Sequence, residues 1–285
     1  MQELWGSQMQ ANTQIETPTA VIAGNPKSFG IFRNGAFAVP AETMNGGIIL
    51  STGNVLDALD MNMMLGTDFG PTGTDAATLT VTFRSSKSVR LEYSYVFASR
   101  ELPEYGGSSY NDFFLMTAQG EFGPVKNIAF LSNNDTVSIS SLVKGPLRST
   151  GQWSPDLIAN FNDGAEVPPA GGRKGTFAGR KNFGYTGFTK TLTARLTVEA
   201  GVPTVLNITI ADVYDGIFDS AVFIATKSLM VKQLVDWDTG MWSECNASCG
   251  AATRTRSVKC VNELGQEQVA GAADTCDPAN KPPTG

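Results

Sequence analysis

The sequence contains no histidine. Histidine is the commonest general base and the usual zinc ligand, so its absence excludes Ser-His and Cys-His catalytic pairs and most zinc sites. The G-x-S-x-G motif, which positions the nucleophile of many hydrolases, is missing as well. We therefore expect a binding or structural protein and not an enzyme.

Long hydrophobic runs are also missing. No stretch approaches the roughly 20 apolar residues of a transmembrane helix, and residues 1–9 lack the basic and apolar regions of a signal peptide. Only 17% of the residues are charged, and the net charge is -6. This balance disfavours nucleic acid and anionic membranes as main partners and leaves divalent cations as candidates.

Cysteine is absent from the first 244 residues and then occurs four times, as Cys245, Cys249, Cys260 and Cys276. This uneven use marks a domain boundary. A small C-terminal segment without a core of its own depends on disulfides, which form in an oxidising compartment. A zinc site made of the four cysteines is the alternative, but their spacing contains no CxxC pair.

Short strands and turns are abundant instead. Thirty glycines and fourteen prolines, together with many Thr, Val and Phe residues, predict an all-β chain with a large β-sandwich or jelly roll. Alternation is clearest over residues 77–83 and 89–97, and we expect these two strands to pair through a turn at 85–88. Further strands are expected over residues 28–37, 47–51, 113–117, 127–131, 137–140, 189–198, 205–211 and 221–227.

A long Gly- and Pro-rich segment interrupts the strands at residues 145–182. It contains a basic cluster of Arg173, Lys174, Arg180 and Lys181. We expect a solvated surface excursion, and a binding loop is the alternative.

Tryptophan and arginine recur near the C-terminus, in WDTGMWSECNASCGAATRTRSVKC at residues 237–260. This segment resembles the opening of a thrombospondin type 1 repeat, in which Trp and Arg side chains interleave as a cation-π stack. The resemblance implies a small disulfide-bonded, Trp/Arg-layered module over about residues 235–285. Alternation agrees, because it places Arg254 and Arg256 on one face, where they can lie over Trp237 and Trp242. The sequence has two tryptophans here, Trp237 and Trp242, with four residues between them. One layer of the usual stack is therefore missing or is filled by Met241.

The same resemblance bears on the cysteines, since the family carries six and this chain has four. It implies a disulfide between Cys260 and Cys276 and leaves Cys245 and Cys249 to partners beyond Gly285, so we expect a partial repeat. A bridge between Cys245 and Cys249 is the alternative, although it is geometrically awkward.

Several modification signals are present. Asn134, Asn207 and Asn246 each begin an N-glycosylation sequon. The resemblance to thrombospondin repeats adds O-fucosylation of Ser248 and C-mannosylation of Trp242. We therefore expect an extracellular glycoprotein.

The larger part of the chain also resembles a known family. SYVFASRELPEYGGSSYNDFF at residues 94–114 and TIADVYDGIFDSAVFI at 209–224 resemble the choice-of-anchor L domain, as do residues 47–55 and 75–83. The resemblance covers about residues 28–228 and implies a secreted or cell-surface location. The expected divisions are therefore an N-terminal extension at 1–27, a β-sandwich at 28–230 and the partial repeat.

Oxygen-bearing side chains gather after two of the expected strands, as Glu101, Glu104, Asn111, Asp112, Asp212, Asp215 and Asp219. If the strands are neighbours, their loops converge, and Ca²⁺, which prefers hard oxygen ligands, could be bound by Glu101, Asn111, Asp112, Asp215 and Asp219. Two alternatives stay open. Asn111, Asp112 and Asp215 are also typical of turns, and paired carboxylates can act in glycosidases.

The leading functional hypothesis is an extracellular structural or adhesion protein, a glycosylated module of a cell-surface, matrix or filament-forming assembly. Its partners would be other protein subunits, bound by strand addition in a homopolymer, or surface glycans. The alternative hypothesis is a calcium-assisted carbohydrate-binding module, and a hydrolase comes third.

Overall fold

The computed structural model describes most of the strands and part of their connections. The described residues are 15–16, 18–35, 37–38, 44–59, 66–70, 75–86, 88–120, 123–144, 152–160, 176–177, 184–225, 230–233, 235–244, 253–262, 267, 276 and 281–284. Within them the helices are short: the 3₁₀ turns Pro26–Ser28 and Val55–Leu59, and the single α-helical turn α3, Ile139–Leu142. The prediction of an all-β chain is confirmed.

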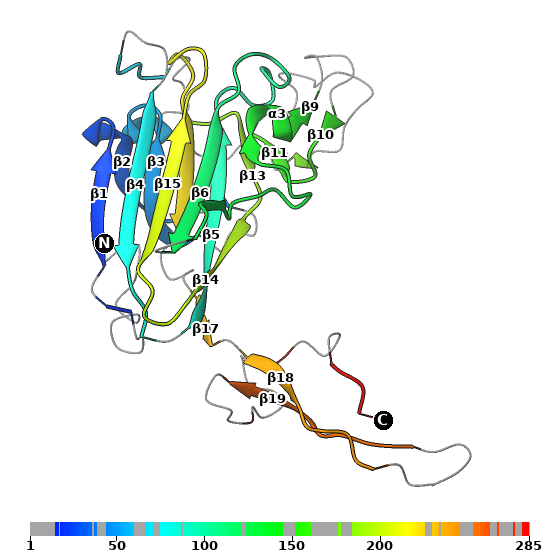
Figure 1. Ribbon diagram of the computed structural model, residues 1–285. Coiled ribbons are helices and arrows are strands. Elements are labelled where there is room, and N and C mark those ends of the chain that lie inside the picture. Colours follow the sequence, from blue (N-terminus) through cyan, green and yellow to red (C-terminus); the bar gives the residue numbers. More distant parts are fainter. Residues whose placement is uncertain are drawn as a thin grey trace.

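The first sheet is antiparallel and is centred on β15 (Figure 1). Its strands, in spatial order, are β1 (Thr19–Ala23), β4 (Ala76–Phe83), β15 (Thr204–Ala211), β6 (Phe113–Gly120) and β7 (Lys126–Asn127), with β8 (Val137–Ser138) also on β6. The segment expected as an N-terminal extension thus contributes the edge strand β1, which pairs with β4.

The second sheet is centred on β5. Its strands, in spatial order, are β12 (Thr176–Phe177), β11 (Leu157–Ala159), β13 (Gly187–Thr189), β5 (Val89–Ser99), β16 (Ser220–Ala225), β3 (Gly46–Ser51) and β2 (Phe29–Arg33), with β14 (Leu192–Val198) and β17 (Met230–Gln233) also on β5. Two smaller pairs complete the fold: β9 (Val143–Lys144) with β10 (Gln152–Trp153), and β18 (Val235–Thr239) with β19 (Val258–Asn262).

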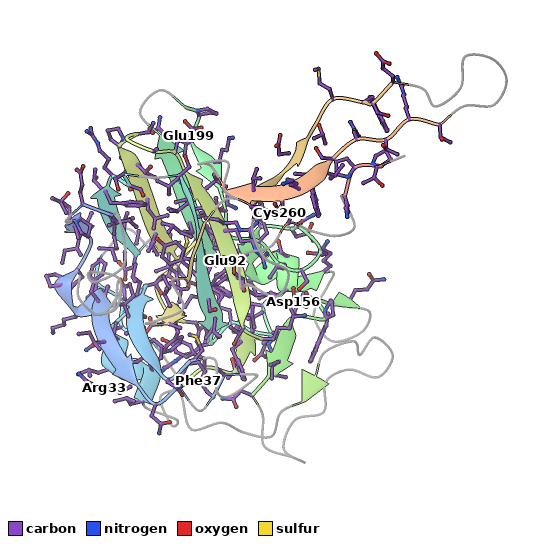
Figure 2. The ribbon with its side chains drawn as sticks, turned by 90° about the horizontal axis from the view of Figure 1, so that it is seen from below. Arg33, Phe37, Glu92, Asp156, Glu199 and Cys260 are labelled. Atoms are coloured by element: carbon purple, nitrogen blue, oxygen red, sulfur yellow. A yellow bond between two sulfur atoms is a disulfide. The ribbon has the colours of Figure 1, made fainter. Side chains whose placement is uncertain are left out.

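The two sheets form the layers of a sandwich, and their inward side chains fill the space between them (Figure 2). On β15 the alternate residues Leu206, Ile208 and Ile210 are fully buried. Inward residues of β5 do the same from the opposite layer, and the rings of Tyr95 and Phe114 meet at 5.1 Å between centroids. Alternation therefore buries one face of each sheet, as expected for a sandwich.

A second cluster covers the outer face of the second sheet. The Phe37 ring lies 4.7 Å from that of Phe223, and both belong to a group with Phe188 and Tyr185. This cover explains why every residue of β16 is buried instead of every second one.

The expected pairing of residues 77–83 with 89–97 is wrong. These segments are β4 and β5, but β4 pairs with β1 and β15, while β5 pairs with strands of the other sheet. Alternation shows that a strand has one buried face, and two strands that face each other across a core satisfy it as well as two that are hydrogen-bonded.

The expectation of a solvated excursion over residues 145–182 is wrong for residues 152–160. There β11 is buried and pairs with β13, and Trp153 lies in the main core. The short apolar run Leu157–Ala159 has enough hydrophobic surface to join the second sheet. The basic cluster at 173–181 lies outside the described residues.

Gly47 allows β3 and β16 to approach closely. A Cβ atom at this position would lie 1.9 Å from the backbone oxygen of Ile224, which cannot move without disrupting the sheet. Gly120, in β6, is a matched control, because its Cβ would meet only Val202 Cγ1, at 3.5 Å.

We expect Gly47→Ala to lower the free energy of unfolding by roughly 2–3 kcal/mol, since the added methyl group overfills a packed region. Gly120→Ala should leave it unchanged or raise it by about 0.5 kcal/mol. Urea denaturation of both variants measures the difference. Equal stability of the two variants would contradict the close approach at Gly47.

Candidate functional site

A row of carboxylates crosses the end of the first sheet. In the register of β15 with its neighbours, Ala211 pairs with Ala76 and with Phe113, so Asp212 comes next to Asp75 on one side and Asp112 on the other. The Asp212 amide donates to the Asp75 backbone oxygen at 2.9 Å. We call Asp75, Asp212 and Asp112 the carboxylate row.

Two carboxylates of the row, Asp112 and Asp212, differ in their partners. Asp112 accepts from the Val213 amide at 3.0 Å and from the Ser220 hydroxyl at 2.7 Å. Asp212 is 3% exposed, with Asp112 and Thr52 beside it, yet neither of its carboxylate oxygens has a hydrogen bond of normal geometry. A buried carboxylate without partners is costly, so Asp212 needs a proton or a cation.

The end of the second sheet adds Asp219 and Arg100. The Arg100 amide donates to the Asp219 backbone oxygen at 3.1 Å, and both oxygens of the Asp219 carboxylate accept from the Thr67 amide. Gly53 and Gly66 lie so close to this carboxylate that a Cβ on either would overlap it. Asp219 is therefore held in place by backbone from three loops.

Glu101 follows β5 and lies close enough to Asp112 for the two charges to interact. It is 2% exposed, and its Oε2 atom has no hydrogen-bond partner. Burial raises the pKa of Glu101 well above its usual value, and the charges of Asp112 and Asp215 raise it further.

Burial also dominates the electrostatics of the other acids. It raises the pKa of Asp112 and of Asp212, and for Asp212 the neighbouring Asp112 charge adds to the effect. For Asp219, burial outweighs the Thr67 hydrogen bonds and the Arg100 charge and raises the pKa to about 7. These side chains therefore retain protons, or take up a cation, at pH values where exposed carboxylates are ionised.

The five residues expected as calcium ligands are not equivalent. Glu101 and Asp112 approach each other, but Asn111 Oδ1 accepts from the Ser140 amide and Asp215 Oδ1 accepts from the Ile217 amide. Asp215 thus has the turn role given as an alternative, whereas Asn111 bonds to α3, far along the chain. Within the ranges that the structure describes, no three Asp, Glu or Cys side chains form a ready metal-binding group.

Asp212 was missing from the expected ligand set, although the sequence holds a signal for it. The inward positions of β15 are every second residue: Leu206, Ile208 and Ile210. The next position in this series is Asp212. The alternation on β6 places Asp112 inward in the same way.

Aromatic side chains gather beside the acids, on the same loops. The Tyr110 ring lies 5.4 Å from Tyr105 and 5.3 Å from Tyr214, and Tyr105 lies 5.5 Å from Phe218. Tyr214 has a φ of 91°, rare for a residue with a side chain, and is 69% exposed. We call these four residues the aromatic patch.

The C-terminal module has the expected layered character around one tryptophan. The guanidinium groups of Arg254 and Arg256 lie 5.0 Å and 4.5 Å from the ring centroid of Trp242. The Trp237 ring has the ammonium group of Lys281 over it at 5.5 Å. Met241 is 95% exposed, so it does not fill a layer.

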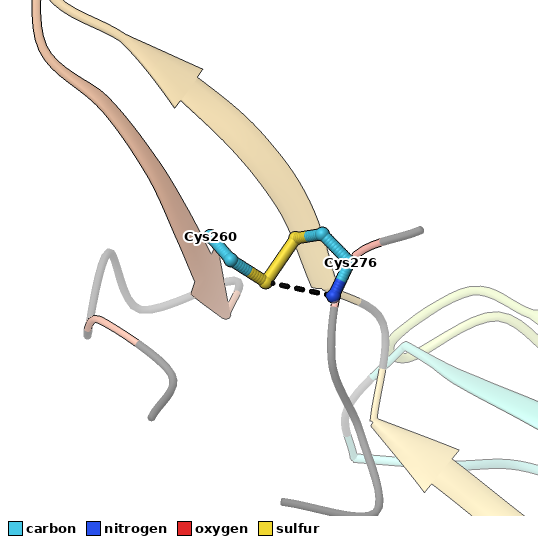
Figure 3. Close-up of a disulfide and its surroundings, with 2 residues drawn as sticks. All are labelled: Cys260 and Cys276. Carbon is cyan, nitrogen blue, oxygen red and sulfur yellow. Dashed lines mark hydrogen bonds between the residues drawn. A yellow bond between two sulfur atoms is a disulfide. The ribbon is translucent and has the colours of Figure 1, made fainter. Parts of the chain in front are cut away.

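Cys260 and Cys276 form a disulfide, the pair that the resemblance implies (Figure 3). Their Cα atoms are 5.6 Å apart, and the Cys276 amide donates to Cys260 Sγ at 2.9 Å. Cys245, Cys249, Asn246 and Ser248 lie outside the described residues.

The two described N-glycosylation sequons have different settings. Asn134 is exposed in a turn, with a φ of 65°. Asn207 lies inside β15, where its Oδ1 atom accepts from the Thr80 hydroxyl at 2.7 Å. Only Asn134 therefore presents a free side chain at a turn, which is where such modification takes place.

Comparison with known proteins agrees with both parts of the fold. The choice-of-anchor L domain model matches residues 2–230. This chain belongs to the choice-of-anchor L domain family. A thrombospondin type 1 domain follows at residues 237–285. Both predicted resemblances are confirmed.

Curated relatives align with short stretches of this chain. The identity is 40% over 47 residues to ADAMTS-like protein 4 of Mus musculus and 44% over 48 residues to A disintegrin and metalloproteinase with thrombospondin motifs 10 of Homo sapiens. It is 43% over 49 residues to A disintegrin and metalloproteinase with thrombospondin motifs gon-1 of Caenorhabditis elegans. These alignments cover 16%, 17% and 17% of this chain and 4%, 4% and 2% of the relatives. The chain thus spans a small part of their length.

One solved structure aligns with about three quarters of this chain. It is the K1 cleaved adhesin domain of Lys-gingipain from Porphyromonas gingivalis W83, at 10% identity, with 74% of this chain and 99% of that chain covered. The TM-score of this alignment is 0.23.

The choice-of-anchor L domain and the thrombospondin type 1 domain together point to an extracellular or cell-surface β-rich protein. Among the described residues, no helix has the length and apolar character to cross a membrane.

We expect the free energy of unfolding to fall as the pH rises from 5 to 7 in a buffer with chelator. Unfolded Asp and Glu side chains release their protons near pH 4, whereas the raised pKa values keep protons on the folded chain up to about 7 at Asp219. The folded state then binds more protons, and stability declines by up to about 1.4 kcal/mol per pH unit for each extra proton. Urea denaturation at several pH values measures the slope.

Asp212→Asn should make this slope shallower, because it removes one of the groups that retain a proton. Asp238→Asn is the control, since Asp238 is exposed in the C-terminal module. A stability that increases between pH 5 and pH 7 would show that the buried acids are not protonated.

Proposed function

We propose that this chain is a non-catalytic, glycosylated structural or adhesion module of an extracellular assembly, and that copies join by strand addition. The observation that carries the proposal is the edge strand β1. All five of its residues, TAVIA, are exposed and uncharged, and Val21 and Ile22 are 67% and 50% exposed.

An edge strand of this kind is a template for another strand. β1 is bonded to β4 on one side, and among the described residues no strand pairs with its other side. Soluble proteins usually protect such edges with lysine, proline or a bulge. Thr19–Ala23 contains none of these residues, which supports a role for the edge in assembly.

A role without catalysis agrees with the placement of the acids. Glu101, Asp112, Asp212 and Asp219 are all nearly fully buried. A glycosidase needs two carboxylates that face a substrate in an open cleft. Two of the buried acids, Asp112 and Asp219, instead accept hydrogen bonds that link loops at one end of the sandwich.

Val21→Lys should weaken self-association at least tenfold, since a charge on the edge opposes strand pairing between copies. Light scattering coupled to size-exclusion chromatography over a range of concentrations measures it. Wild-type protein should grow in mass with concentration, and the variant should stay closer to a monomer.

Leu56→Lys is the matched control, because Leu56 is 65% exposed and lies on a 3₁₀ turn instead of an edge. It should associate like the wild type. A wild-type protein that stays monomeric at every concentration would refute strand addition, and equal loss in both variants would point to general surface hydrophobicity.

A calcium-assisted carbohydrate-binding module is the second candidate, and the unpartnered oxygens of Glu101 and Asp212 favour it. A cation beside them would supply the charge that these buried carboxylates lack, and the nearby Asp112 carboxylate adds negative charge that favours the cation. The aromatic patch on the same loops supplies ring faces on which the apolar side of a sugar can lie.

Calcium at millimolar concentration should then raise the melting temperature of the wild type at pH 7.5 by several degrees relative to a chelator, because a ligand that binds only the folded state stabilises it. Asp112→Ala should abolish the shift and Asp238→Ala should retain it. Differential scanning calorimetry measures both. An identical melting temperature with calcium and with chelator would rule out the cation.

A further inference from the structure

A groove of about 540 Å³ is lined by residues of the segments 127–134 and 190–195. Phe130 and Asn134 line it on one side, and Lys190, Thr193 and Arg195 line it on the other. Its volume is in the range of small-ligand sites.

The first side of the groove is a tight hairpin. Phe130 and Thr136 are bridge partners, the Leu131 amide donates to the Asp135 oxygen at 2.9 Å, and the Asn134 amide donates to the Leu131 oxygen at 2.9 Å. The Tyr95 hydroxyl anchors the hairpin to the core through the Phe130 backbone oxygen, also at 2.9 Å. The hairpin is therefore a rigid support.

The turn brings an aromatic ring and a complete sequon together. Phe130 is 36% exposed, and both Asn134 and Thr136 are exposed. Asn134 has a φ of 65°, which asparagine tolerates better than most residues. Asn134, the residue of the sequon that would carry the glycan, therefore lines the groove.

The other side of the groove is polar and is held by ion pairs. Lys190 Nζ lies 2.7 Å from Asp156 Oδ1, and Arg195 Nε lies 3.1 Å from Glu92 Oε1. Figure 2 labels Asp156 and Glu92, the two acidic partners. These ion pairs restrain the charged groups of Lys190 and Arg195, whose N–H groups can donate hydrogen bonds into the groove.

We propose that this groove holds the first sugars of an N-linked glycan carried by Asn134 of the same chain. The inference rests on the extracellular, glycosylated character of the proposed function. In the modification, Asn134 Nδ2 loses a proton and bonds to C1 of the first N-acetylglucosamine, and the lipid-linked diphosphate of the donor leaves.

The chemistry of the two walls matches the two sides of such a sugar. The C–H face of N-acetylglucosamine is apolar and gains by covering the exposed Phe130 ring. Its acetamido carbonyl and hydroxyl groups can accept hydrogen bonds from Lys190, Thr193 and Arg195. A free saccharide has the same chemistry, but only the glycan of Asn134 is already attached at the groove.

Asn207 shows why the assignment is specific to Asn134. Its side chain is part of a polar ladder across the first sheet, where Thr80 donates to it and Thr78 and Thr209 are hydrogen-bonded one pair away. A glycan there would break this ladder in the centre of the sheet. We therefore expect Asn134 to be occupied and Asn207 to be bare.

The test uses the full chain secreted from a eukaryotic host, with glycan occupancy read by mass spectrometry of peptides. Four proteins are compared by thermal unfolding: wild type, Asn134→Gln, Phe130→Ala and the double variant. The glycan should raise the melting temperature by roughly 2–4 °C when Phe130 is present. Its effect should fall to a third or less when Phe130 is alanine.

Two further measurements locate the effect. Trimming the glycan enzymatically to a single N-acetylglucosamine should preserve most of the stabilisation, because the first sugar covers the ring. Leu59→Ala, at an exposed leucine on Val55–Leu59, is the control and should leave the glycan effect unchanged.

Several outcomes would overturn the proposal. They are a bare Asn134, an equal glycan effect with and without Phe130, and tight binding of free chitobiose to Asn134→Gln, which would assign the groove to an external saccharide. None of these outcomes affects the proposal of strand addition, which is tested independently by the molar mass of the Val21→Lys variant in solution. Failure of strand addition would equally leave the groove assignment standing.

Discussion

The burial of inward-facing side chains on β15 and β5 is the constraint on which the rest of the sandwich depends. Every second residue of each strand is apolar and points into the space between the sheets. Asp212 follows the last residue of β15 at the next inward position, so its side chain is buried, next to Asp112. The acidic end is thus a direct extension of the alternation that builds the core.

The two domains are stabilised by different interactions. The choice-of-anchor L domain has enough apolar residues for a conventional core and holds it without cysteine. The thrombospondin type 1 domain is too thin for such a core, so guanidinium groups on Trp242 and the Cys260–Cys276 disulfide take its place. The abrupt change in cysteine use reflects this difference.

Local patterns predicted the strands well and their partners poorly. The alternation over 77–83 and 89–97 correctly located β4 and β5, yet it could not show that they belong to different sheets. For the site, loop positions correctly brought Glu101 near Asp112. They could not show that Asn111 Oδ1 accepts from the Ser140 amide, because this contact joins residues far apart in the chain.

The sequence by itself determined the all-β class, the two families and their order, because these depend on residue type and local spacing. It also contained the sequon at Asn134 and the uncharged run at 19–23. Only the tertiary structure decided that Asn134 meets a groove with Phe130, that Asn207 is held within a sheet and that residues 19–23 form an edge. Such facts depend on contacts between residues far apart in the chain, and the register of strands, not their composition, sets those contacts.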